Sequence, residues 1–435
     1  MIEIINIIYL TIGLTLIFLS PTQLVYKFTK NNNLNFFEIY SINIVFILNI
    51  FLLFSFFSFN LNYIFFLFTI IGVINFFYIH KNFKFKNDYL FLTFLLFVFL
   101  YSIKIASNLR LEWDAAVLWI YRTLNFYEGF NFWNLKNVHD GSLAYPHLGT
   151  YGWALIWKNS LIDFEYTGRI FYIFTYLVSI FLIISKYNFS FRFNLIIAFI
   201  ATSMTFDLGL FSGYQEPLMF ALVIFLFVLI YKANNFNHLN ILHWICIINA
   251  NLILWVRNEG VAFIIYILLI LLIEKKIKKQ IKLFFLLSFS TIILIKFLIF
   301  NFYFTENLIG WKGYQFINFD QFFSYEILQR FLLLIFQLNI IFFKYPIYII
   351  FILFLLYQIL IKNFKHDDFK YLIFFILNCL MSFSIYYFVD DQRWHFHSSV
   401  TMDRILYQSS GIYLIFILNF CQKYFFKSKI NYNNL

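Results

Sequence analysis

Long apolar runs, separated by short polar stretches, follow one another along almost the whole chain. A run of about 20 apolar residues, rising about 1.5 Å per residue, covers a hydrocarbon core of about 30 Å. Such runs must be helical, because lipid offers no partner for an unpaired N–H or C=O. The pattern therefore predicts an all-α, polytopic integral membrane protein.

We expect about thirteen transmembrane helices, with ends good to a few residues. They lie near 4–20, 39–58, 61–80, 89–106, 168–185, 192–208, 216–232, 239–256, 260–273, 283–302, 345–361, 371–389 and 404–420. No repeat or Pro-rich linker divides them, so we expect one membrane domain. The first run lacks a basic start and a small-residue cleavage site, which favours a retained span over a signal peptide.

Basic residues in the loops set the expected orientation, because Lys and Arg concentrate on the cytoplasmic side. If the segment 322–343 does not cross the membrane, all of the strongly basic segments fall on that side. They lie near positions 27–30, 81–86, 186–192, 232, 275–282 and 362–370, and in the tail 421–435. That segment carries Glu326, Arg330 and Gln337 at helical spacings. It is typical of an amphipathic or re-entrant helix on the outer surface.

Composition agrees with a membrane protein and narrows the function. Hydrophobic residues make up 62% of the 435 residues and charged residues only 12%. The net charge of +11 comes from topogenic loops, and no Gly-rich phosphate loop or basic aromatic module is present. We therefore expect a lipid bilayer as partner and no nucleic acid. Three scattered Cys residues show no metal spacing.

The expected outer side collects the polar residues that could carry chemistry. Glu112 and Asp114 follow directly on the fourth span. A carboxylate at the lipid–water boundary is partly desolvated, so its basicity is tunable and suits a general base. The competing interpretation is an acid that stabilises a helix N-terminus. We favour the functional interpretation for Asp114 and the structural one for Glu112.

Two polar turns on the same side add further candidates. Glu216 precedes Pro217 at a helix start, where it could face Asp114, hold a Mg²⁺ or Mn²⁺ ion with it, or simply cap the helix. Arg257 and Glu259 lie in a turn between apolar spans, where a self-paired hairpin is the plainer interpretation. The aromatic loop 107–167, which holds Tyr145 and His147, predicts interfacial helices.

The last outer loop holds a cationic group. Arg393, His395, His397 and Arg404 together look like an anion site, with Arg404 opening the final span near a lipid phosphate. An interfacial anchor paired with Asp403 is the alternative for Arg404. Zinc on the two His residues lacks a third ligand at a convincing spacing. Lys312 lies above the outer end of the tenth expected span.

In their order, these features resemble the GT-C superfamily of membrane glycosyltransferases, which includes the protein O-mannosyltransferases and bacterial enzymes that use polyprenyl-phosphate-linked sugars. The resemblance rests on Asp114, on Tyr-Pro-His-Leu at 145–148, on Arg169, on Gly-Tyr-Gln-Glu-Pro at 213–217 and on Arg-Asn-Glu-Gly at 257–260. The outer helix at 322–343 and Arg404 complete it. The match covers 86–420, with three additional N-terminal helices in 1–85 and a cytoplasmic tail at 421–435.

The resemblance implies a glycosyltransferase of the cell membrane with an extracytoplasmic active site. Asp114 would be the catalytic base, Glu216 the second acid near a metal or the acceptor, and Arg404 a contact to the donor phosphate. Substrate contacts would come from Arg257, Glu259, Tyr145, His147, Lys312, Arg393, His395 and His397. The donor would be a polyprenyl-phosphate-linked sugar, and the acceptor a glycan, a lipid or a protein.

Two other functions stay open at this point. An O-antigen ligase or polymerase would use the Arg and His residues of the 390–404 loop. A transporter or flippase would need polar groups at the bilayer midplane and interrupted helices, and the sequence shows no paired Gly/Pro-interrupted spans.

Overall fold

The computed structural model describes residues 2–82, 88–107, 109–137, 145–187, 191–205, 208–234, 238–304, 315–316, 325–390 and 394–425. By its contacts the chain forms two compact units. Unit 1 comprises 1–202 and 206–312, and unit 2 comprises 203–205 and 313–435. The helices of 1–85 pack within unit 1, so they do not form a separate body. Each unit is described below by itself.

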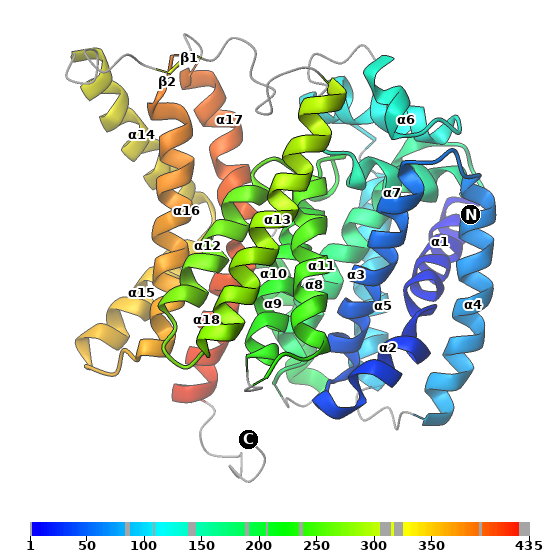
Figure 1. Ribbon diagram of the computed structural model, residues 1–435, viewed down its shortest axis with the longest axis horizontal. Helices are drawn as coiled ribbons and strands as arrows, with labels where there is room; N and C mark the ends of the chain where they lie inside the picture. The colour runs from blue at the N-terminus through cyan, green and yellow to red at the C-terminus, as the bar shows by residue number, and fades with distance from the viewer. Residues whose placement is uncertain are drawn as a thin grey trace. The chain divides into compact units, whose positions relative to one another are not determined.

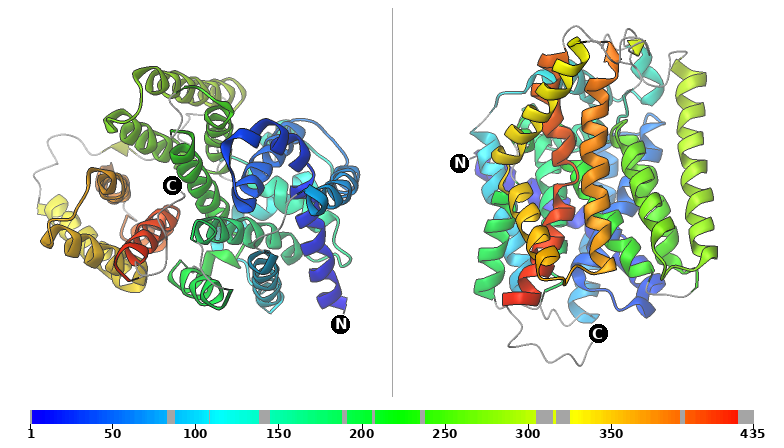
Figure 2. Two further views of the ribbon diagram at one scale, coloured as in Figure 1. Left: turned by 90° about the horizontal axis from the view of Figure 1, so that it is seen from below. Right: turned by 90° about the vertical axis from the view of Figure 1, so that its left-hand side faces the viewer.

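Among its described residues, the regular secondary structure of unit 1 is helical. Its helices are α1 (Ile2–Leu19), α2 (Thr22–Thr29), α3 (Phe36–Ser55), α4 (Leu61–Asn82), α5 (Asp88–Ala106), α6 (Ile120–Tyr127), α7 (Leu148–Lys158), α8 (Ile170–Ile184), α9 (Phe191–Met204), α10 (Glu216–Ala233), α11 (Ile241–Val256), α12 (Gly260–Ile273) and α13 (Lys279–Phe304). A short π-helical turn, η2 (Ala115–Trp119), precedes α6. Figure 2 (left) shows the long helices nearly end-on and side by side.

Local sequence signals explain where several of these helices begin. Asn35 caps α3 in a capping box, in which its side chain accepts from the Glu38 N–H and Glu38 accepts in return. Asn240 caps α11, where His243 takes the place of Glu. Pro217 occupies the first turn of α10, where its missing N–H costs nothing.

The core of unit 1 is the helix α8, whose side chains are all buried. It contacts α5, α3 and α10, and α10 in turn packs on α11. The outer helices have the opposite character, since large apolar side chains such as Leu287 (60% exposed) and Phe199 (64%) face outward. A water-soluble protein rarely exposes apolar surface on this scale, so the outward faces are lipid-facing.

The two ends of unit 1 differ. In Figure 1, α6 and α7 lie at one end, whereas α2 and the turn between α12 and α13 lie at the other. That second end carries Lys27 and the Lys275–Lys282 cluster. The aromatic loop and these basic segments are therefore separated along the bundle. Which end faces the cytoplasm stays a prediction from the charge pattern.

Unit 2 contains α14 (Tyr325–Lys344), α15 (Pro346–Leu360), α16 (Phe369–Tyr387), α17 (Trp394–Tyr407) and α18 (Ser410–Phe425). Two short strands, β1 (Gln315–Phe316) and β2 (Val389–Asp390), pair antiparallel. The helix α14 packs on α16 and α17, whereas α15 packs on α18. In Figure 2 (right), α14 and α15 together run from one end of the unit to the other, and α16 returns.

The prediction of a multi-pass helical membrane protein is confirmed at this coarse level. Among the described residues, nine helices are long and apolar enough to span a bilayer, or ten if the bent pair α17–α18 is one span. Four other expected spans correspond to shorter apolar helices, namely α9, α11, α12 and α15. The helix α14 passes the same test of length and hydropathy, so its expected place on the outer surface stays a prediction.

A topology reporter fused after Ile361 should report a cytoplasmic location. Because α14 and α15 together run from one end of unit 2 to the other (Figure 2, right), we expect the chain to change sides once between 325 and 360. The basic residues of 362–370 favour the same side. A reporter after Tyr387, at the other end of α16, is the control and should give the opposite signal. An extracytoplasmic signal at 361 would show that α14 and α15 cross separately.

Candidate functional site

Arg169 hydrogen-bonds to two backbone segments that lie far apart in the sequence. Sequence analysis had connected these segments only through the family resemblance. Arg169 is fully buried, and its Nη1 donates to the carbonyls of Phe211 (2.8 Å) and Arg110 (3.2 Å). Its Nη2 donates to the carbonyl of Leu109 (3.0 Å), and Glu165 balances its charge. Because these carbonyls flank the start of the aromatic loop and the turn before α10, Arg169 fixes both backbones to one helix end.

The segment that carries Asp114 lies directly on the turn that carries Glu216. The Glu112 N–H donates to the Ser212 carbonyl (3.3 Å). Gly213 adopts φ = 85°, and a Cβ on it would lie 2.9 Å from Leu111 Cδ2 and 3.1 Å from Ala115 Cβ. The π-helical turn η2 begins at Ala115, directly after Asp114, and such turns are frequent at functional sites. The two acidic segments therefore meet.

Gly213→Ala should destabilise the protein more than Gly129→Ala. Both glycines have a positive φ, which costs an L-residue about 1–2 kcal/mol. At Gly129 a Cβ would meet nothing within 4 Å, whereas at Gly213 it would also approach Trp153 Cη2 to 2.8 Å. Thermal unfolding of both variants in detergent measures the difference. Equal decreases in melting temperature would show that the Asp114 segment is not in close contact with the turn at Gly213.

Glu216 belongs to a buried ionic network that includes the turn after α11. Arg257 Nη1 donates to Glu216 Oε1 (2.5 Å), while its Nε and Nη2 donate to Glu259 Oε2 (3.1 Å) and Oε1 (2.8 Å). Lys296 on α13 donates to Asn258 Oδ1 (3.1 Å). Lys296 is buried beside this network.

Several polar atoms at the same turn have no hydrogen-bond partner among the described residues. They are Ser212 Oγ and both amide atoms of Gln215, and both side chains are buried. Gln215 presses on α7, since a Cβ on Gly149 would lie 2.6 Å from its Oε1. Buried polar groups normally have partners, so these atoms are suited to a hydroxylated ligand or to bound water.

His147 is a buried residue whose contacts are structural. Its Nε2 lies 2.6 Å from Ser55 Oγ, which donates its single proton to the Leu52 carbonyl (2.6 Å). The His147 Nε2–H is therefore the donor, and Nδ1 carries no proton. Burial, helped by the charge of Arg122, lowers the pKa of His147 to about 3. The ring is neutral and surrounded by aromatic side chains.

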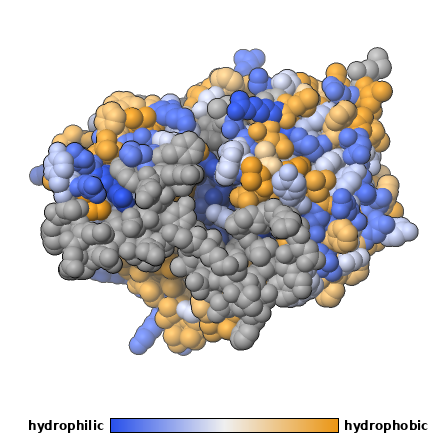
Figure 3. All heavy atoms as spheres, turned by 90° about the horizontal axis from the view of Figure 1, so that it is seen from above, coloured by the Kyte–Doolittle hydropathy of each residue, from blue (hydrophilic) through white to orange (hydrophobic). Residues whose placement is uncertain are grey.

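Tyr145 links this region to the ionic network. Its carbonyl accepts from Arg122, which is 1% exposed, and its ring packs edge-on against Trp119. The charge of Arg257 also interacts with Tyr145. Arg122 was not singled out from the sequence, where only its position as a lone cation in an aromatic segment marks it. The end of unit 1 that holds these residues presents hydrophilic side chains mixed with apolar ones (Figure 3, right half).

The late-loop candidates belong to unit 2. Arg404 is buried on α17, and its neighbour Asp403 accepts from Lys344 (2.7 Å) and from the Tyr345 hydroxyl (3.3 Å). His395 is exposed. Arg393 and Lys312 lie outside the described residues, as does the side chain of His397. The role expected of Arg404 stays a prediction.

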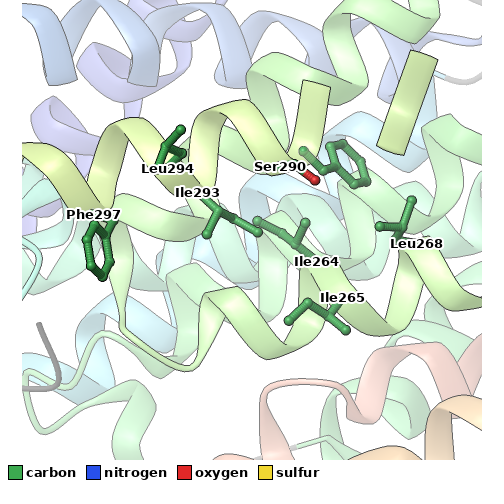
Figure 4. A pocket seen from close by; sticks show the side chains of 8 residues that line it. Ile264, Ile265, Leu268, Ser290, Ile293, Leu294 and Phe297 are labelled. Atoms are coloured by element: carbon green, nitrogen blue, oxygen red, sulfur yellow. The ribbon is translucent and has the colours of Figure 1, made fainter. Parts of the chain in front are cut away.

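The described residues do not bring together three or more His, Cys, Asp or Glu side chains in a way that could hold a metal ion. An apolar groove of about 400 Å³ runs between α12 and α13 in unit 1 (Figure 4). Its lining includes Ile264, Ile293 and Phe297. Because Phe297 follows Lys296 and Ile264 lies one turn beyond Gly260, the groove begins beside the ionic network.

No family model, curated protein or solved structure matches the chain.

Proposed function

We propose that the protein is a membrane glycosyltransferase of GT-C type, with about thirteen spans in which the shorter helices α9, α11, α12 and α15 also cross. The observation that carries the proposal is the contact between the Asp114 segment and the Ser212–Glu216 turn. A general base, a second acid and unpartnered polar atoms then lie on neighbouring segments at one end of unit 1. This is the arrangement that transfer to a hydroxyl group requires.

The proposed reaction moves a sugar from polyprenyl phosphate to an acceptor hydroxyl. The acceptor oxygen attacks the anomeric carbon, its proton passes to the Asp114 carboxylate, and the bond between that carbon and the phosphate oxygen breaks. Polyprenyl phosphate leaves with the electron pair, and configuration inverts. Ser212 and Gln215 supply donors and acceptors for sugar hydroxyls. By resemblance alone, Arg404 remains assigned to the donor phosphate.

The groove between α12 and α13 supports a lipid-linked donor. Its walls are apolar. An isoprenoid chain in the groove would remain within the bilayer. Purified protein should therefore transfer sugar from a defined polyprenyl-phospho-sugar to a panel of glycan, lipid and peptide hydroxyls. Absence of transfer and of donor binding across the panel would contradict the proposal.

A transporter is the second candidate, because unit 2 contains interrupted helices. The pair α17–α18 bends by 48° at its break, and α14 gives way to α15 at Tyr345-Pro346. Lys344 and Asp403 pair at the second break. Gln408 at the first break is fully buried, and neither of its amide atoms has a hydrogen-bond partner within the described part of the chain. Buried polar groups at interrupted helices are typical of transport sites.

The two candidate functions differ in the residues whose substitution should abolish activity. A transferase loses activity with Asp114→Asn and tolerates Gln408→Leu. A transporter shows the reverse in an uptake or scrambling measurement with reconstituted vesicles.

A further inference from the structure

We infer that the guanidinium of Arg257 occupies the position a divalent cation would take between Glu216 and Glu259, so this acidic pair binds no metal. The resemblance leaves room for Mg²⁺ or Mn²⁺ on Asp114 and Glu216. Glu216 Oε1 already accepts from Arg257 Nη1 at 2.5 Å, and both oxygens of Glu259 accept from the same guanidinium. Three of the four carboxylate oxygens of this pair therefore already accept from one guanidinium, which leaves no shared position for a metal ion between them.

The charges and burial of the three groups support this assignment. The side chains of Glu216, Arg257 and Glu259 are 2%, 10% and 17% exposed, so water screens them poorly. Burial alone would lower the pKa of Arg257, but the charges of Glu216 and Glu259 raise it well above its ordinary value. A permanently charged group thus bridges two carboxylates. Mg²⁺ or Ca²⁺ would need those oxygens at about 2.0–2.6 Å, where the guanidinium now lies.

Lys296 lies at the edge of the network. Its amino group donates to the side-chain oxygen of Asn258, the residue between Arg257 and Glu259 in the sequence. The charge of Arg257 offsets one of the two carboxylate charges, so the pair attracts a metal ion less strongly. In the proposed transferase, on which this last role rests, Arg257 would supply the positive charge that a metal supplies elsewhere.

Metal binding by the purified full-length protein tests the inference without any assay of transfer. Mn²⁺ is titrated into wild type and into Arg257→Ala, with calorimetry and thermal unfolding as readouts. Wild type should bind no Mn²⁺ at millimolar concentration, and its melting temperature should not change. Arg257→Ala leaves two buried carboxylates facing each other. It should melt at a lower temperature, gain Mn²⁺ binding and recover stability as Mn²⁺ is added.

Three variants serve as controls. Arg257→Ala combined with Glu216→Gln should lose the gained binding, because one carboxylate remains. Arg257→Lys should gain none, since a cation still occupies the position. Lys344→Ala removes the cation from Asp403 and leaves a single carboxylate that still accepts from the Tyr345 hydroxyl, so it should gain none either.

Two results would overturn the inference. One is Mn²⁺ binding by wild type that Glu216→Gln abolishes. The other is an Arg257→Ala protein that folds and gains no Mn²⁺. An Arg257→Ala protein that does not fold even with Mn²⁺ present belongs to the second result, because the cation then does not replace the guanidinium. Neither outcome depends on whether the protein transfers sugars.

Discussion

Asp114→Asn should lower the rate of sugar transfer by about 10²–10⁴-fold, the range that a positioned general base contributes. The amide cannot take the proton of the acceptor hydroxyl. It is nearly isosteric with the carboxylate, so the π-helical turn after it and the contact of its neighbours with the Ser212–Glu216 turn should persist. Single-turnover transfer from a polyprenyl-phospho-sugar in detergent measures the loss.

Glu112→Gln is the matched control for this variant. Glu112 contacts the same turn, but through its backbone N–H, which the substitution keeps. We therefore expect a change of less than about tenfold, well below the contribution of a general base. Donor affinity should change little in both variants, because neither residue is assigned to the phosphate. Near-normal transfer by Asp114→Asn would remove the base from the mechanism and favour the late-loop Arg and His residues.

Acidification below about pH 6.5, the ordinary pKa of His, should destabilise the protein through His147. The pKa of this residue is about 3 in the folded protein, because burial and the charge of Arg122 disfavour the imidazolium. Between pH 6.5 and 3 the unfolded chain therefore binds a proton that the folded chain does not. The stabilisation is complete above pH 6.5 and is lost as the pH falls towards 3, by about 5 kcal/mol in total.

The measurement is the melting temperature in detergent from pH 7.5 to 4.5, for wild type and for His147→Gln. Gln keeps an N–H donor for Ser55 but does not titrate. Its curve should fall less steeply than that of wild type, although other groups titrate in both proteins. Parallel curves would show that His147 is protonated in the folded protein at mildly acid pH, so that it is not sealed from water.

The sequence predicted individual residues of the candidate site, but not which of them contact one another. Asp114, Glu216, Arg257 and Glu259 stand out in the sequence because charges are rare in apolar segments. The resemblance supplied their order. The plain interpretation of Arg257 and Glu259 as a pair within one turn agrees with the structure, but the bond from Arg257 to Glu216 joins residues 41 positions apart. A span-by-span pattern of hydropathy contains no information on which turns lie side by side.

The sequence by itself determined that this is a helical membrane protein, because hydropathy over about 20 residues and the cost of unpaired backbone groups in lipid are local quantities. It also placed the helix start at Pro217, since the signals at a helix N-terminus depend on a few neighbouring residues. Only the tertiary structure decided that Arg169 binds carbonyls 42 and 60 residues away and that α17 and α18 are separated by a bend. Those outcomes depend on which helices pack together, because a buried polar group takes the partner that packing brings within hydrogen-bond distance.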